Sequence, residues 1–104
     1  MSKLKVLGED IDLDTDAAQT AVEMDETPFA PGFNAVAVVS LAGPTGTPTV
    51  LIEGSDDNST FSTLATITDI TQLLVMKEVT LKRYMRLNVT EVGSAGTVTA
   101  YLQA

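Results

Sequence analysis

Apolar and polar residues alternate along most of the chain, in short runs separated by clusters of turn-forming residues. The clearest case is residues 50–64, where two alternating runs flank the polar sequence Gly-Ser-Asp-Asp-Asn. A period of two places successive side chains on opposite faces of a strand, and Gly, Ser, Asp and Asn favour tight turns. The pattern therefore predicts a β-hairpin with strands near residues 49–54 and 60–68.

Further runs of strand length lie on both sides of this hairpin. Residues 34–41 are almost continuously apolar, which is typical of a strand buried on both faces. Residues 83–91 and 97–103 alternate, and the Gly- and Ser-containing segment between them predicts a second hairpin. Its inward-facing side chains are expected to be Met85, Leu87, Val89, Val98, Ala100 and Leu102. The remaining strand-like runs cover residues 3–7, 9–16, 17–24 and 72–81.

Two of the segments between these runs are predicted to be irregular. The loop at residues 25–33 contains two prolines, and Phe29 and Phe33 within it are expected to close one end of the core. The segment 42–48 is rich in Gly, Pro and Thr, which predicts a turn. Residues 17–24 also fit a helical turn capped by Asp16, but their β-like neighbours favour a strand.

About eight short strands, with turn signals close to every ten residues, predict an all-β fold. The expected architecture is an antiparallel β-sandwich that resembles a jelly roll. Because 104 residues suffice for one core, a single domain is predicted over residues 1–104. Residues 1–8 could form either an N-terminal arm or an edge strand.

The composition narrows the possible chemistry, because the chain contains neither cysteine nor histidine. Disulfides, thiolate nucleophiles, histidine acid–base catalysis and most zinc, copper or haem sites need those residues. Acidic residues are plentiful, but no motif pairs two carboxylates for hydrolysis, and no glycine-rich loop is placed to hold a phosphate. We therefore expect no enzymatic activity, no catalytic residues and no cofactor.

One acidic segment has the spacing of a calcium-binding loop. Asp12, Asp14 and Asp16, with Glu23 following, match acidic positions of a twelve-residue calcium loop. Ala17 stands where that loop needs a glycine for its sharp turn. The pattern therefore favours a solvated acidic strand edge without a metal, and leaves calcium binding as the second interpretation.

The chain is strongly acidic, with 14 Asp and Glu residues against 6 Lys and Arg and a net charge of −8. Nucleic acids are bound through Lys and Arg at phosphates, so a nucleic-acid partner is not expected. No apolar run reaches the roughly 18 residues of a membrane span, and no signal-peptide pattern is present, so we expect neither membrane insertion nor secretion. The acidic balance instead favours a basic protein partner.

Lys82, Arg83 and Arg86 form a basic cluster in this otherwise acidic chain. Basic residues at a sheet margin either pair with nearby acids or contact a partner protein. Tyr84 and Tyr101 fall opposite the predicted core side, so each could belong to a sugar-binding surface or to a subunit interface. A carbohydrate-binding β-sandwich domain is therefore an alternative to a protein-binding module.

Three stretches carry a resemblance to known proteins. Their sequences are Val-Leu-Ile-Glu-Gly-Ser-Asp-Asp-Asn-Ser-Thr-Phe at 50–61, Lys-Arg-Tyr-Met-Arg-Leu-Asn-Val-Thr at 82–90 and Gly-Thr-Val-Thr-Ala-Tyr at 96–101. The pattern resembles small tailed-phage virion proteins, and it also recurs in discoidin-like jelly-roll domains. With its compact length and acidity, the chain looks more similar to phage capsid decoration, or cement, proteins.

This resemblance implies a β-sandwich that assembles as a dimer or trimer on the capsid exterior and bridges neighbouring subunits of the major capsid protein. It also implies synthesis in the cytoplasm of a host bacterium, and it leaves a head fibre or tail adhesin as another role within the virion. We expect the capsid contacts to come from the N-terminal arm and the basic cluster. The residues concerned are Lys3, Leu4, Lys5, Val6, Lys82, Arg83 and Arg86.

Overall fold

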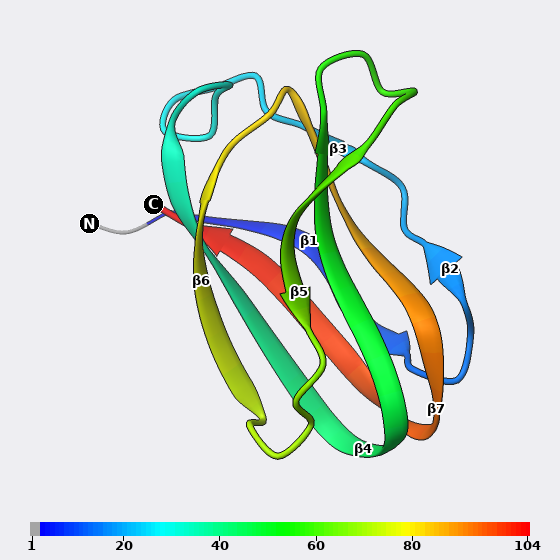
Figure 1. Ribbon diagram of the computed structural model, residues 1–104. Helices are drawn as coiled ribbons and strands as arrows, with labels where there is room; N and C mark the ends of the chain where they lie inside the picture. Colours follow the sequence, from blue (N-terminus) through cyan, green and yellow to red (C-terminus); the bar gives the residue numbers. More distant parts are fainter. Residues whose placement is uncertain (1–2) are drawn as a thin grey trace.

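The computed structural model describes residues 3–104 as an antiparallel all-β structure, with no helix in that range and hence none that could cross a membrane. All strands are hydrogen-bonded into one strongly curled sheet (Figure 1). The strands are β1 (Leu4–Asp12), β2 (Ala17–Ala18), β3 (Val22–Glu23), β4 (Asn34–Ser55), β5 (Ser62–Ile67), β6 (Leu74–Thr80) and β7 (Tyr84–Gln103). The prediction of an all-β antiparallel fold is confirmed.

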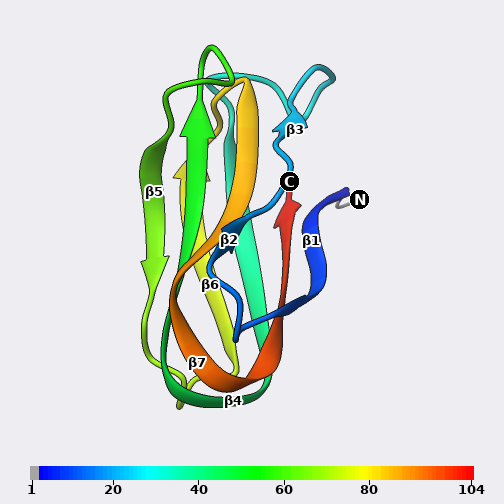
Figure 2. The same ribbon diagram turned by 90° about the vertical axis from the view of Figure 1, so that its right-hand side faces the viewer.

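Two long strands, β4 and β7, pair with each other over almost their whole length. The ladder runs from the pair Val36 and Gln103 to the pair Ser55 and Tyr84. Its register shifts repeatedly between Ala42 and Val50, and such bulges bend a strand and increase its twist. Figure 2 shows both strands turning together at the bottom of the view, so that each contributes one half to each of two facing layers.

The shorter strands extend these two layers. Layer A contains β6, residues 34–42 of β4, residues 97–103 of β7, and β1, in that order. Layer B contains β5, residues 49–55 of β4, residues 84–90 of β7, and then the short strands β2 and β3. The molecule is therefore a thin slab, with extents of 37 × 32 × 17 Å.

The hydrophobic core lies between the two layers and is lined by alternate residues of β4 and β7. The six inward-facing residues predicted for residues 83–103 are all completely buried, which confirms the predicted faces. Phe29 is also buried, as predicted, but Phe33 is 45% exposed, so the prediction that it closes the core is wrong. Aliphatic residues therefore form most of the core.

The predicted turn at residues 42–48 and the second predicted hairpin are wrong. Residues 42–48 stay within β4, and the two halves of β7 form one strand in which each half pairs with β4. Gly43, Gly46 and Gly96 adopt positive φ angles of 60°, 79° and 103°. Glycine tolerates this backbone conformation, so each strand folds over through bulges from one layer to the other without forming a hairpin with itself. Two long bent strands thus replace four of the short strands that the pattern predicted.

The first predicted hairpin and the edge strand are present. Glu53 pairs with Thr63 and Gly54 with Ser62, so β4 and β5 form the hairpin expected for residues 49–68. Residues 4–8 belong to β1, which pairs with β7 at the edge of layer A. Of the two alternatives for residues 1–8, the edge strand therefore applies to residues 4–8; residues 1 and 2 lie outside the described range.

The corner of the ladder can be tested at Gly96. A Cβ atom there would lie 2.7 Å from the Cα atom of Pro44 and 2.9 Å from the carbonyl oxygen of Ala42, both of which are backbone atoms that cannot rotate away. We expect Gly96→Ala to lower the free energy of unfolding in urea by about 3 kcal/mol, because the steric clash adds to the cost of a positive φ. Gly43 has a positive φ but open space around it, so the control Gly43→Ala should cost only about 1 kcal/mol. Equal losses in the two variants would contradict the close approach of the two strands.

Candidate functional site

The outer surface of layer B carries a polar network built across the ladder. Glu53 of β4 and Arg86 of β7 are register partners, so their side chains lie on the same face of the sheet. Arg86 Nε donates a hydrogen bond of 2.7 Å to Glu53 Oε1, and Asn88 Nδ2 donates one of 3.2 Å to the same oxygen. The Glu53 side chain is only 10% exposed, so these charge-assisted bonds compensate a carboxylate that has lost most of its water.

An aromatic ring holds Arg86 from another direction. The Cζ atom of Arg86 lies 3.7 Å from the centroid of the Phe61 ring, which is cation–π contact distance. The guanidinium is thus bound by Glu53, stacked on Phe61 and three-quarters buried. Arg86 was expected to contact a partner, but the structure gives it partners within the chain, and its place is structural.

The other two residues of the basic cluster remain at the surface. Arg83 Nε and Nη2 lie 3.0 and 2.9 Å from Glu23 Oε2, and this hydrogen bonding raises the pKa of Arg83 above its usual value. Lys82 Nζ lies 3.8 Å from Asp56 Oδ2, and both side chains are well exposed. Exposed pairs of this kind contribute little and exchange readily. These two cations are therefore available to another acidic surface.

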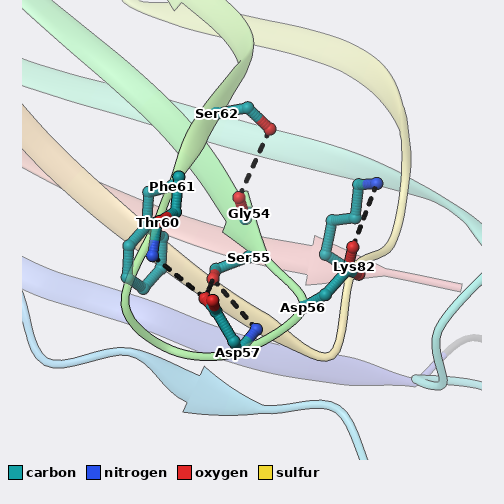
Figure 3. Close-up of a pocket in the computed structure, with 8 residues that line it drawn as sticks. All are labelled: Gly54, Ser55, Asp56, Asp57, Thr60, Phe61, Ser62 and Lys82. Carbon is teal, nitrogen blue, oxygen red and sulfur yellow. Dashed lines mark hydrogen bonds and ion pairs between the residues drawn. The ribbon is translucent and has the colours of Figure 1, made fainter.

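A shallow hollow of about 270 Å³ lies beside this cluster, at the tip of the first hairpin. Figure 3 shows Asp57 in the hairpin loop that lines this hollow, close to Ser55 and Thr60. Asp57 Oδ1 accepts hydrogen bonds from the amides of Thr60 and Ser59 and from Ser55 Oγ. These bonds, led by that from Thr60, lower the pKa of Asp57. The carboxylate is thus occupied in shaping the turn, which is the role expected of an Asp in this turn sequence.

The structure separates the two predicted groups of contact residues. Lys3, Leu4, Lys5 and Val6 belong to or adjoin β1 in layer A, whereas the basic cluster lies on layer B. Lys5 Nζ is 3.8 Å from Asp25 Oδ1. Leu4 and Val6 are 61% and 53% exposed, so their apolar side chains are open to solvent. The residues expected to act together therefore occupy two different surfaces.

The sequence interpretation missed Leu74 and Met76, two exposed residues of β6. A signal was available, because residues 73–76 form four consecutive apolar positions. When only one face of an edge strand is covered, such a run leaves alternate side chains in water. Among the side chains that the structure describes, which include the acidic segment around Asp14, no group of three or more acidic residues is placed to hold a metal ion.

The place of Arg86 can be tested by denaturation. We expect Arg86→Met to lower the free energy of unfolding by about 2 kcal/mol, because Glu53 would remain nearly buried with its main cation removed. The matched variant Arg83→Met breaks an exposed pair and should cost less than about 1 kcal/mol. Restoring much of the loss with the double variant Glu53→Gln/Arg86→Met would support the pairing. Equal losses at Arg86 and Arg83 would refute it.

Comparison of the chain with family models, with curated proteins and with solved structures found no match. The functional interpretation therefore depends on the residues and surfaces described above, together with the resemblance in three sequence stretches. No residue role is transferred from a relative.

Proposed function

We propose that this protein is a structural component of a tailed-phage virion, which binds the outer surface of the capsid and bridges subunits of the major capsid protein. One observation carries the proposal: side chains suited to protein contacts lie on both layers of a thin slab. Leu4 and Val6 are exposed on layer A, and Lys82 and Arg83 on layer B. A protein that bridges must contact at least two bodies at once, either two capsid subunits or one capsid subunit and a second copy of itself, so it needs two such surfaces.

The strand order supports a jelly-roll classification within the all-β fold. If the bent strands β4 and β7 are each divided at their corner, and β2 and β3 are counted together, eight strands result. Strands that follow one another in sequence then alternate between the two layers, except that the second half of β4 and the next strand, β5, both lie in layer B. Jelly rolls occur in viral capsid proteins and in lectins, so this classification favours a virion role without excluding sugar binding.

Binding to a capsid needs no chemistry beyond complementary surfaces. A small protein that contacts several subunits only at their mature spacing stabilises that spacing by mass action. Lys82 and Arg83 can leave their exposed partners at a cost below about 1 kcal/mol. These two residues, and no longer Arg86, are the proposed basic contacts with acidic groups of the capsid.

The carbohydrate-binding alternative has less support from the arrangement of aromatic residues. Sugar platforms require an aromatic ring with an open face. The guanidinium of Arg83 lies 5.7 Å from the centroid of the Tyr84 ring, so one face of that ring already has a neighbour. Tyr101 is half-buried between apolar neighbours on layer A. Neither tyrosine stands free as a platform.

Co-sedimentation with purified mature capsids that lack this protein tests the proposal. We expect the wild-type protein to pellet with capsids up to a saturating ratio, and Arg83→Glu to bind at least tenfold more weakly. The control Lys77→Glu makes the same charge change at an exposed residue of β6 and should bind like the wild type. A wild-type protein that stays in the supernatant but binds a glycan array would overturn the capsid proposal. Equal binding by the two variants would remove Arg83 from it.

A further inference from the structure

The outer surface of layer A is apolar across the width of the sheet. Residues paired directly across antiparallel strands have side chains on the same face. The pairs Met76–Val38, Val38–Tyr101 and Tyr101–Val6 therefore form one row from β6 to β1. Leu4, Val36 and Leu74 lie in the adjacent rows. We call these residues the apolar face: Leu4, Val6, Val36, Val38, Leu74, Met76 and Tyr101.

Burial shows that this row points away from the core. Ala37 and Val39 belong to the core cluster, but Val38 between them does not, although it is only 1% exposed. Val38 is flanked in its row by Met76 and Tyr101 on the neighbouring strands. Apolar side chains at the two edges of the layer are open instead. Leu74 and Met76 on β6 are 56% and 61% exposed, and Leu4 and Val6 on β1 are 61% and 53% exposed.

Such an arrangement is unusual for a solvated sheet face. Antiparallel sheets with one face in water normally place polar side chains there, and contiguous exposed apolar patches mark protein contacts. Four of the large exposed hydrophobic residues in the described range belong to this one face: Leu4, Val6, Leu74 and Met76.

We propose that the apolar face is the contact surface of a symmetric dimer of this chain. The inference does not depend on capsid binding, because it concerns the free protein in solution. It assigns Leu4 and Val6 to contact with a second copy, whereas Lys82 and Arg83 on layer B stay free for a different partner.

The geometry of the face fits a second copy. The exposed side chains of Met76 on β6 and Val6 on β1 lie at the two edges of layer A. Between them lie Val38, which is buried by its neighbours, and the half-buried Tyr101. A two-fold rotation about an axis parallel to the strands brings the β6 edge of one copy over the β1 edge of the other. Met76 then meets Val6 of the second copy, twice, as an isologous interface requires.

Area and charge agree with the same arrangement. The broad face of the slab spans 37 by 32 Å, so it has room for the roughly 800 Å² per partner of a standard interface. The row through Val36 consists of Glu78, Val36, Gln103 and Leu4, and the row through Val38 consists of Met76, Val38, Tyr101 and Val6. Glu78 carries the one charged side chain in these two rows. The two-fold rotation places it over the Leu4 end of the second copy, so no two Glu78 carboxylates meet.

Electrostatics gives the dimer a recognisable dependence on salt. Each copy carries a net charge of −8, so two copies repel at long range, and this repulsion is screened as ionic strength rises. Apolar burial does not weaken under the same conditions. Dimerisation should therefore strengthen with sodium chloride, whereas association through surface ion pairs would weaken.

Sedimentation equilibrium of the purified chain tests the inference at several protein concentrations and at low and high sodium chloride. We expect a monomer–dimer equilibrium that shifts toward dimer at high salt. Met76→Glu and, separately, Val6→Glu should weaken dimerisation at least tenfold. Thr66→Glu adds the same charge to an exposed site on β5 of layer B, where its register partner is the apolar Leu51, and should behave like the wild type. Thermal unfolding checks that all variants stay folded.

Three results would overturn the inference. A wild-type chain that stays monomeric at all concentrations and salts would leave the apolar face for a different protein. Dimers that dissociate equally in Met76→Glu and Thr66→Glu would place the interface elsewhere. A trimer would contradict the two-fold arrangement. Each of these results can arise whether or not the protein binds capsids, so the two proposals can fail separately.

Discussion

The hydrogen-bonded ladder between β4 and β7 is the interaction on which the rest of the structure depends. Each of the other five strands pairs with β4 or β7, and both layers are continuations of this one ladder. The core is built from alternate residues of the same two strands, so a register slip of one residue would turn their apolar side chains outward. Bulges in the ladder and glycines at its corner let it bend back on itself, which is how one sheet encloses a core.

The bend also explains why the two outer surfaces differ. Residues 35–39 of β4 are apolar on both sides, so the outward side chains of Val36 and Val38 contribute to an apolar face on layer A. Residues 49–55 of the same strand carry Glu53, whose carboxylate organises Arg86 and Asn88 on layer B. One continuous strand thus supplies an apolar surface at one end and a polar surface at the other. A small protein with two different contact surfaces can assemble with itself and still contact something else.

Local sequence patterns predicted the strands well because alternation depends only on which side of a strand faces the core. Met85, Leu87 and Val89 were assigned to the core from their spacing alone, and all three are fully buried. Pairing between strands was harder to predict. The segments around Gly43 and Gly96 have the composition of hairpin turns, but their glycines serve bulges where the two strands cross closely. Composition does not distinguish a bulged bend within one long strand from a hairpin turn between two strands, because glycines at positive φ angles are used in both.

The contact residues, too, could be predicted from the sequence only in part. The charge pattern located the basic cluster, but the partner of Arg86 is Glu53, which is 33 positions away in the sequence and adjacent only through the ladder. The apolar face is formed by β1, β4, β6 and β7, so no single stretch contains it. Only the runs of apolar residues at 34–41 and 73–76 indicated that a strand has apolar side chains on both sides.

Backbone NMR distances test the central claim, the continuous ladder, most directly. The account predicts nuclear Overhauser effects between backbone protons of Val38 and Tyr101 in layer A, and of Ile52 and Leu87 in layer B, with slow amide exchange along both halves. Nuclear Overhauser effects that join residues 84–90 directly to residues 97–103 would instead indicate a hairpin within the C-terminal segment. That result would contradict the ladder, and with it the two layers and both proposed surfaces.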